Sequence, residues 1–278
     1  MTMTPMEAAR QYRSDRSNRF FGYGGVVTPD GKGVQSKVDG RYWFLLRKLH
    51  LLNYVNVTGS PSITYLARFI DEARRQACQN VQMAPCILGG NGNSPNVLPA
   101  PMLFGPTELM QLELDRVPTR VHWHLEGEHI TDPDPAWVAR VQRRSWYQLG
   151  LLDMDTTGTQ SVTYGDDKFD FAIMRILSLN GVAGVIANAN PGKMKIRSIG
   201  PVTELWSNDE VSHLVYAGVY GFGAGPRPLV TPRIITNGTK IEVQTRAIPD
   251  VGYEDIVFDG VKYPAGTRLE DWLDTAGL

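Results

Sequence analysis

Apolar residues at three- and four-residue spacing predict an amphipathic helix near the middle of the chain. Asp166 and Asp167 are suitable helix caps, and Asn180-Gly181 is a suitable helix end. Between them, the positions that would share one helical face are Phe169, Ala172, Ile173, Ile176 and Leu177. Residues 182–187 then form an apolar run long enough for a buried strand. The pattern predicts a capped helix that leads directly into a strand.

Capping residues followed by apolar periodicity predict further helices. The start signals are Thr4-Pro5, Ser60-Pro61, Asp134-Pro135 and the Ser207/Glu210 capping box. The second of these helices would reach Ala77, the third Leu149 and the fourth about Tyr216. Residues 42–57 are apolar on most sides, so periodicity allows either a buried helix or two strands.

Alternation and turn dipeptides predict strands elsewhere. In residues 120–125, Val121, Trp123 and Leu125 would share one face of a strand. Residues 83–88 are typical of a strand at a sheet edge, because they include a proline. Asn237-Gly238 and Asp259-Gly260 each favour a β-hairpin. A short closing helix would carry Leu269, Trp272 and Leu273.

Helices early in the chain and hairpins late in it indicate an α+β fold. We expect several capped helices packed on a mixed or antiparallel sheet, with C-terminal β-hairpins and long irregular loops. Three regions follow: an N-terminal helical arm at residues 1–20, an α+β core at residues 21–228, and a hairpin region with a closing helix at residues 229–278. The core includes residues 89–106, whose glycines, prolines and asparagines predict a long loop.

The overall charge argues against a strongly basic nucleic-acid-binding protein. The 278 residues include 28 basic and 29 acidic ones, for a formal charge of -1, although a local basic patch remains compatible with this total. We therefore expect DNA contact to be at most indirect. Two cysteines, Cys78 and Cys86, favour either a reducing compartment or a protein that does not depend on redox state. The apolar runs are too short for a membrane span.

The one cluster that suggests chemistry lies in residues 122–129. His122 and His124 would project from one face of a strand, with Cα atoms roughly 7 Å apart, which is close enough to share a metal. Together with Glu128, their spacing resembles the first half of the cupin metal motif over seven residues. The resemblance implies a metal-dependent hydrolase or oxygenase that uses these three residues. It departs from the family at Arg116 and Pro135, where glycines are expected, and the downstream ligand would have to be His213.

Other features favour a structural protein with no catalytic residues and no cofactor. Arginines recur every three residues in the N-terminal arm, at Arg10, Arg13, Arg16 and Arg19. With the loop at residues 89–106 and the two hairpins, this organisation resembles the ring-forming head–tail connector and tail proteins of tailed bacteriophages. The resemblance implies a virion structural protein, assembled in the host cytoplasm as a cyclic homo-oligomer that also contacts other virion proteins. The metal-dependent enzyme is the alternative, and a monomeric binding module whose long loop forms a ligand cleft is a third possibility.

Overall fold

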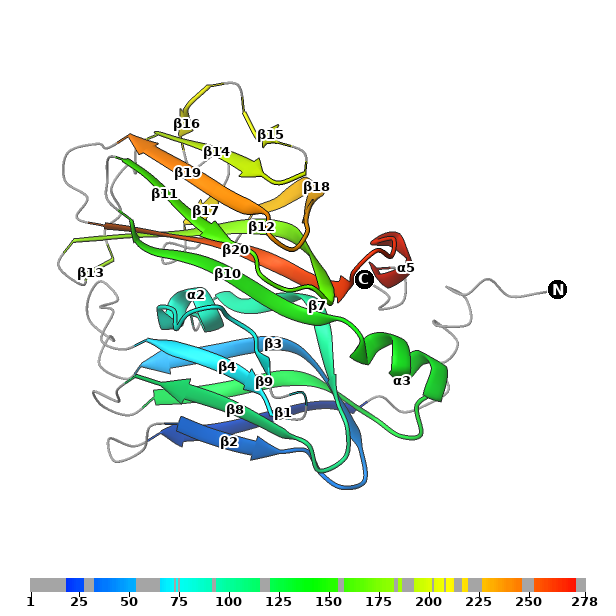
Figure 1. Ribbon diagram of the computed structural model, residues 1–278. Helices are drawn as coiled ribbons and strands as arrows, with labels where there is room; N and C mark the ends of the chain where they lie inside the picture. The colour runs from blue at the N-terminus through cyan, green and yellow to red at the C-terminus, as the bar shows by residue number, and fades with distance from the viewer. Residues whose placement is uncertain are drawn as a thin grey trace.

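The computed structural model describes a chain built mainly from antiparallel strands (Figure 1). The residues it describes are 19–27, 33–53, 66–72, 74, 76–91, 94–115, 121–154, 158–182, 185–186, 193–201, 203–207, 209–212, 217–219, 227–246 and 253–273. Strands account for 65% of the structure, and the described residues include three short helices. The predicted N-terminal arm lies almost entirely outside these residues, as does the Thr4-Pro5 helix start.

Two antiparallel sheets form the lower half of the molecule in Figure 1. The first has the order β1-β9-β3-β7-β6, and the second has the order β2-β8-β4-β5. The bounds in the first sheet are β1 Arg19–Val27, β9 Val121–Ile130, β3 Trp43–Asn53, β7 Ser94–Phe104 and β6 Gly90–Asn91. Those in the second are β2 Gly33–Lys37, β8 Leu109–Leu114, β4 Ala67–Asp71 and β5 Gln76–Ala77.

Two more sheets form the upper half. One has the order β10-β20-β12-β18, with β13 and β17 also paired to β12, and the other has the order β11-β19-β14-β15, with β16 also paired to β14. The bounds in the first are β10 Ser145–Met154, β20 Tyr253–Pro264, β12 Phe169–Val182, β18 Arg227–Ile235, β13 Val185–Ile186 and β17 Ala217–Val219. Those in the second are β11 Gly158–Thr163, β19 Lys240–Arg246, β14 Lys193–Ile199, β15 Glu204–Leu205 and β16 Val211–Ser212.

The two halves repeat one strand order. If the short strands β6, β13, β16 and β17 are set aside, each half has eight strands in sequence. In both halves the first, eighth, third and sixth strands form one sheet, and the second, seventh, fourth and fifth form the other. Two facing four-stranded sheets with this connectivity are a jelly roll. The chain is therefore two jelly rolls in tandem.

Each jelly roll has its own apolar core between its two sheets. In the first, Phe44, Leu46 and Trp123 face Phe69 and Leu112 across the sandwich. The residues that fill the second core include Phe171, Ile173, Ile176, Ile196, Val243 and Phe258. Side chains alternate between core and surface along most of these strands, as expected when one face of a sheet is buried.

The helix α2, Pro85–Gly89, lies between the two halves (Figure 1). Ile87, with Met83 and Ala84 just before the helix, packs on Leu177 and Val257 from the second jelly roll. Two further helices, α3 (Pro135–Gln142) and α5 (Glu270–Leu273), cover the outer faces of sheets. No helix in the described part of the chain is both long and apolar enough to cross a membrane.

A buried polar network also joins the halves. Arg175 on β12 pairs with Asp259 on β20 and donates a hydrogen bond to Asn96 Oδ1 on β7, at 2.6 Å. Asp259 also accepts a hydrogen bond from Trp146 Nε1 at 2.6 Å. The Trp146 ring lies in the core of the first jelly roll although β10 belongs to the second. The halves are therefore joined by both apolar and polar contacts.

The predicted α+β fold is wrong, because most of the expected helices are strands. The segment that carries Phe169 to Leu177 is β12, and the segment after Ser60-Pro61 contains β4 and β5 within its described residues. Residues 83–88, predicted as a strand, contain most of α2. The predicted Ser207 helix is replaced by β16 within the described residues. The predicted loop at residues 89–106 is largely β7.

The two predicted hairpins are also wrong, for different reasons. A turn does form at Asn237-Gly238, where Gly238 has a φ of 78° and Thr239 N–H donates to the Thr236 carbonyl. The strands on either side of it, β18 and β19, belong to facing sheets and do not pair with each other. Asp259-Gly260 lies inside the continuous strand β20.

Three predictions are confirmed, at least in part. The alternation of residues 120–125 belongs to β9, whose inward positions are buried. Asp134 caps α3 by accepting hydrogen bonds from two backbone N–H groups, although the helix ends at Gln142 and β10 follows. The closing helix is α5. Residues 42–57, left open between a buried helix and two strands, instead contain the single strand β3 within their described residues.

Candidate functional site

Strand β9 carries the predicted site residues on the outer face of its sheet. Its inward residues Trp123 and Leu125 are in the core, so His122, His124 and Glu128 point away from the sandwich interior. Since side chains alternate along a strand, Glu126 joins them on the outer face. The structure therefore places the three predicted residues on one face, as the spacing indicated.

Ion pairs connect this face of β9 to the neighbouring strand β3. Arg47 Nε donates to Glu128 Oε1 at 2.6 Å, and Lys48 Nζ donates to Glu126 Oε1 at 2.5 Å. Because Glu128 accepts a hydrogen bond from a guanidinium, its carboxylate has a cationic partner without a metal. No group of three or more His, Cys, Asp or Glu side chains suited to a metal ion occurs among the described residues.

A histidine that the sequence did not suggest lies beside His124. His50 on β3 is paired in register with His124, and the two ring centroids are 5.6 Å apart. His50 Nε2 is 3.3 Å from Glu126 Oε2. Burial lowers the pKa of His50, and Glu126 opposes that shift. No sequence pattern indicates this pair, because the pairing of β3 with β9 joins residues 74 positions apart and is set by tertiary structure.

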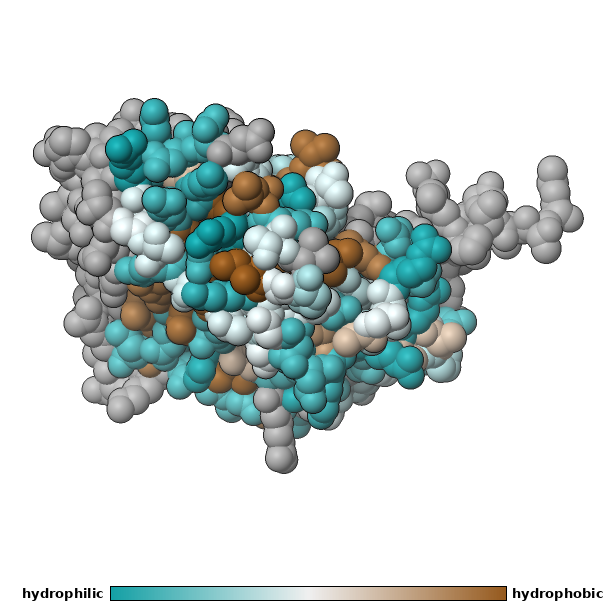
Figure 2. All heavy atoms as spheres, turned by 45° about the horizontal axis from the view of Figure 1, so that its top comes forward, coloured by the Kyte–Doolittle hydropathy of each residue, from teal (hydrophilic) through white to brown (hydrophobic). Residues whose placement is uncertain are grey.

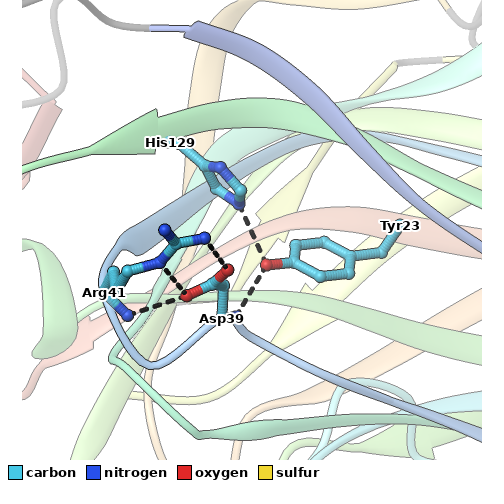
Figure 3. Close-up of polar contacts among 4 residues, drawn as sticks. All are labelled: Tyr23, Asp39, Arg41 and His129. Carbon is cyan, nitrogen blue, oxygen red and sulfur yellow. Dashed lines mark hydrogen bonds and ion pairs between the residues drawn. The ribbon is translucent and has the colours of Figure 1, made fainter.

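A second polar cluster surrounds His129 at one end of β9 (Figure 3). Tyr23 Oη lies 2.9 Å from His129 Nε2 and accepts a hydrogen bond from the Asp39 N–H, also at 2.9 Å. The Asp39 carboxylate in turn accepts hydrogen bonds from the Arg41 backbone and guanidinium. With its oxygen already accepting from Asp39, the Tyr23 hydroxyl is placed to donate to neutral His129.

Aromatic rings enclose the imidazole of His129. Phe21 and Tyr42 stack on its two sides, with centroid distances of 4.1 and 4.7 Å, and Phe44 contacts it edge-on. Burial lowers the pKa of His129, which favours the neutral ring. His129 belongs to the 122–129 segment that the sequence singled out. It lies an even number of residues from Trp123 and Leu125, so the alternation along β9 indicates that it faces inward with them. Its ring packs against the first core through Phe44.

The two histidines with lowered pKa predict a loss of stability in mild acid. Both bind protons more weakly when the protein is folded than when it is unfolded. The stability that depends on the two neutral imidazoles is therefore fully present above the unfolded pKa, near 6.5. It is lost as the pH falls from there through the folded pKa values. Urea unfolding should give a free energy that falls below about pH 6.5, and the double variant His50→Gln/His129→Gln should flatten that dependence. An unchanged dependence would contradict the assignment.

The cysteine Cys78 is an unsuitable nucleophile in this structure. It is fully buried, and burial raises the pKa of its thiol well above the ordinary value. Because the thiolate is the reactive form, a raised pKa suppresses its reactivity.

Comparison with known proteins gives structural matches only. No protein-family model matches the sequence, and comparison with curated proteins finds no match. The STIV major capsid protein aligns with a TM-score of 0.46 and 9% identity over 89% of this chain and 97% of that chain. A chain of the Sulfolobus turreted icosahedral virus structure gives 0.41 and 8% over 88% and 91%. PNGase F, a glycosylasparaginase from Flavobacterium meningosepticum, gives 0.37 and 8% over 90% and 97%.

Proposed function

We propose that this chain is a virion structural protein, a subunit that assembles with copies of itself and with other proteins of the particle. The observation that carries the proposal is the eight-strand order that occurs twice in one chain. Jelly rolls build viral capsid proteins, and also lectins and cupins. The TM-scores of the virus proteins above stay below 0.5, so the proposal is based on the strand order of this chain.

The junction between the jelly rolls favours a building block over two independent binding modules. Domains that act separately are joined by linkers with few contacts between them. Here Trp146 enters the neighbouring core and Arg175 bonds to Asn96 in the other half. A fused pair of this kind presents a large surface of fixed shape, which is what lateral packing between identical subunits requires.

We do not propose the connector or tail position that the sequence resemblance implied. The likeness to phage connector and tail proteins depended on the arginine arm, the loop at residues 89–106 and two hairpins. The loop is largely strand β7, the hairpins do not pair, and residues 1–18 lie outside the described residues. We propose a shell subunit in place of a connector, with cyclic association of the copies and assembly in the host cytoplasm.

Purified protein tests this proposal directly. Mass photometry over a hundredfold range of concentration should show oligomers whose share rises with concentration. Negative-stain electron microscopy of the same samples should show closed, symmetric assemblies. A monomer whose mass does not change over that range, at several ionic strengths, would contradict the proposal.

The alternative is a metal-dependent hydrolase or oxygenase that uses His122, His124 and Glu128. The observation in its favour is the second histidine, His50, beside His124. Elemental analysis of untagged protein tests it. Stoichiometric zinc, iron or manganese that is lost in the His122→Ala/His124→Ala variant would favour the enzyme. We favour the shell subunit because Glu128 is bound to Arg47 and the site lies on an outer sheet face.

A further inference from the structure

The outer face of one sheet in the second jelly roll is strongly basic. On β14, Met194 and Ile196 point into the core, so Lys193, Lys195 and Arg197 point outward. The register pairs Lys193 with Arg246 on β19, and Ile199 with Lys240. We call this surface the basic face. Its cations are Lys193, Lys195, Arg197, Lys240 and Arg246.

Acidic side chains are few among the outward positions of these strands. Glu242 on β19 is shared by Arg197 and Lys240, and Glu210 lies 3.5 Å from Arg246. The outward positions of β11, β14 and β19 carry five cations and one carboxylate, that of Glu242. The whole chain has a formal charge of -1, so positive charge is concentrated here and negative charge lies elsewhere. A sheet face with this excess attracts a polyanion.

Apart from Ile199 on β14, the remaining outward side chains of these strands are polar. Strand β11 contributes the exposed Thr159, Ser161 and Thr163, and β19 contributes the exposed Gln244. In Figure 2, which brings the upper layer of Figure 1 forward, hydrophilic residues predominate over these strands. Leu205, half exposed, is at the margin on β15.

This composition favours nucleic acid over a protein partner. Protein interfaces are enriched in aromatic residues and depleted of lysine. The outward positions of β11, β14 and β19 include no aromatic residue and three lysines. Lys, Arg, Ser, Thr and Gln are the side chains that bond to phosphate oxygens. Single-stranded nucleic acid is usually bound by stacking of its bases on aromatic rings, so a face without them suits a duplex.

We propose that the basic face binds the phosphate backbone of double-stranded nucleic acid without reading its sequence. In the proposed virion subunit, on which this inference builds, the ligand would be the packaged genome. Alternate residues of a strand are about 6.8 Å apart, so three cations on β14 follow one another along a line on a flat sheet. Such a line can contact successive phosphates of a backbone laid across it. The overall charge of the chain had suggested at most indirect contact with DNA, but the distribution of charge favours a direct one.

The test is binding of a fluorescent DNA duplex by anisotropy at several salt concentrations. The face variant is Lys193→Gln/Lys195→Gln/Arg246→Gln, which leaves Glu242 with both of its partners. The matched control removes three exposed cations elsewhere, as Arg143→Gln/Lys168→Gln/Arg268→Gln. We expect the face variant to bind at least about tenfold more weakly at 50 mM salt, and the slope of log K against log salt to fall by about 2 to 3. The control should stay within about twofold of the unmodified protein.

Three results would overturn the inference. They are no binding of the duplex by the unmodified protein at low salt, equal weakening in both variants, and a face variant that binds DNA normally but assembles poorly. The last would make the basic face a contact between copies. Protein that forms particles yet ignores DNA would refute this inference alone. A permanent monomer that binds duplex through the basic face would refute the shell proposal and leave the binding surface in place.

Discussion

Replacement of Arg175 by Met should destabilise the protein by about 3–5 kcal/mol, because it leaves the buried Asp259 carboxylate without its cation. Asp259 is fully buried, and Trp146 Nε1 also donates a hydrogen bond to it. Asn96, also fully buried, would lose its bond to the guanidinium. Urea unfolding of the two proteins at pH 7 measures the difference. A loss below about 1 kcal/mol, the size expected of an exposed pair, would show that the junction does not depend on this network.

The pair formed by Arg233 and Glu204 provides the matched control. Both side chains are about half exposed and lie 3.3 Å apart, so Arg233→Gln should cost less than about 1 kcal/mol. Acid distinguishes the two variants further. Burial raises the pKa of Asp259, and Arg175 opposes that shift. Without Arg175 the carboxyl takes up a proton more readily, which removes the unpaired charge. The loss in free energy of unfolding that Arg175→Met causes should therefore become smaller as the pH falls. The loss that Arg233→Gln causes should not.

The sequence predicted the turn at Asn237-Gly238 and the cap at Asp134 correctly but assigned the wrong period to the central strands. Strand β12 is buried on both faces, by the second core on one side and by α2 and α5 on the other. A register shift between Ile173 and Arg175 adds a residue to the strand. The inward positions are consequently Phe171, Ile173 and Ile176. The three-residue spacing between Ile173 and Ile176 is the spacing expected on one face of a helix. Burial on two faces and a bulge both require tertiary contacts that local periodicity does not contain.

The candidate sites were predictable only where they lie within one strand. Alternation placed His122, His124 and Glu128 on one face of β9, and the structure has them there. Their partners come from distant strands: Arg47 and His50 from β3, and Tyr23 from β1. The basic face likewise depends on the pairing of β14 with β19. Single strands can be inferred from spacing, but neighbours across a jelly roll depend on a strand order that no short motif specifies.

Gly260→Ala should destabilise the protein by about 3 kcal/mol, at the upper end of the usual cost of overpacking. Gly260 follows Asp259 in what looked like a turn dipeptide, but it lies in mid-strand, where a Cβ would be 1.9 Å from the Ala172 carbonyl oxygen and 2.9 Å from its carbon. The obstructing atoms are backbone atoms of β12, so no side-chain rotation relieves the contact. The two central strands of the second jelly roll would have to separate locally. Thermal unfolding followed by circular dichroism measures the effect.

Gly165→Ala distinguishes this crowding from the general effect of adding a methyl group. A Cβ at Gly165 would meet no atom within 4 Å, and the residue does not have a positive φ. That substitution should be neutral or stabilising by up to about 1 kcal/mol, because alanine restricts the unfolded chain more than glycine does. Equal losses at the two positions would contradict the argument. A large loss at Gly260 alone would mean that this glycine is required by the close approach of β12 and β20, on which the buried Arg175–Asp259 pair, and with it the junction of the two jelly rolls, depends.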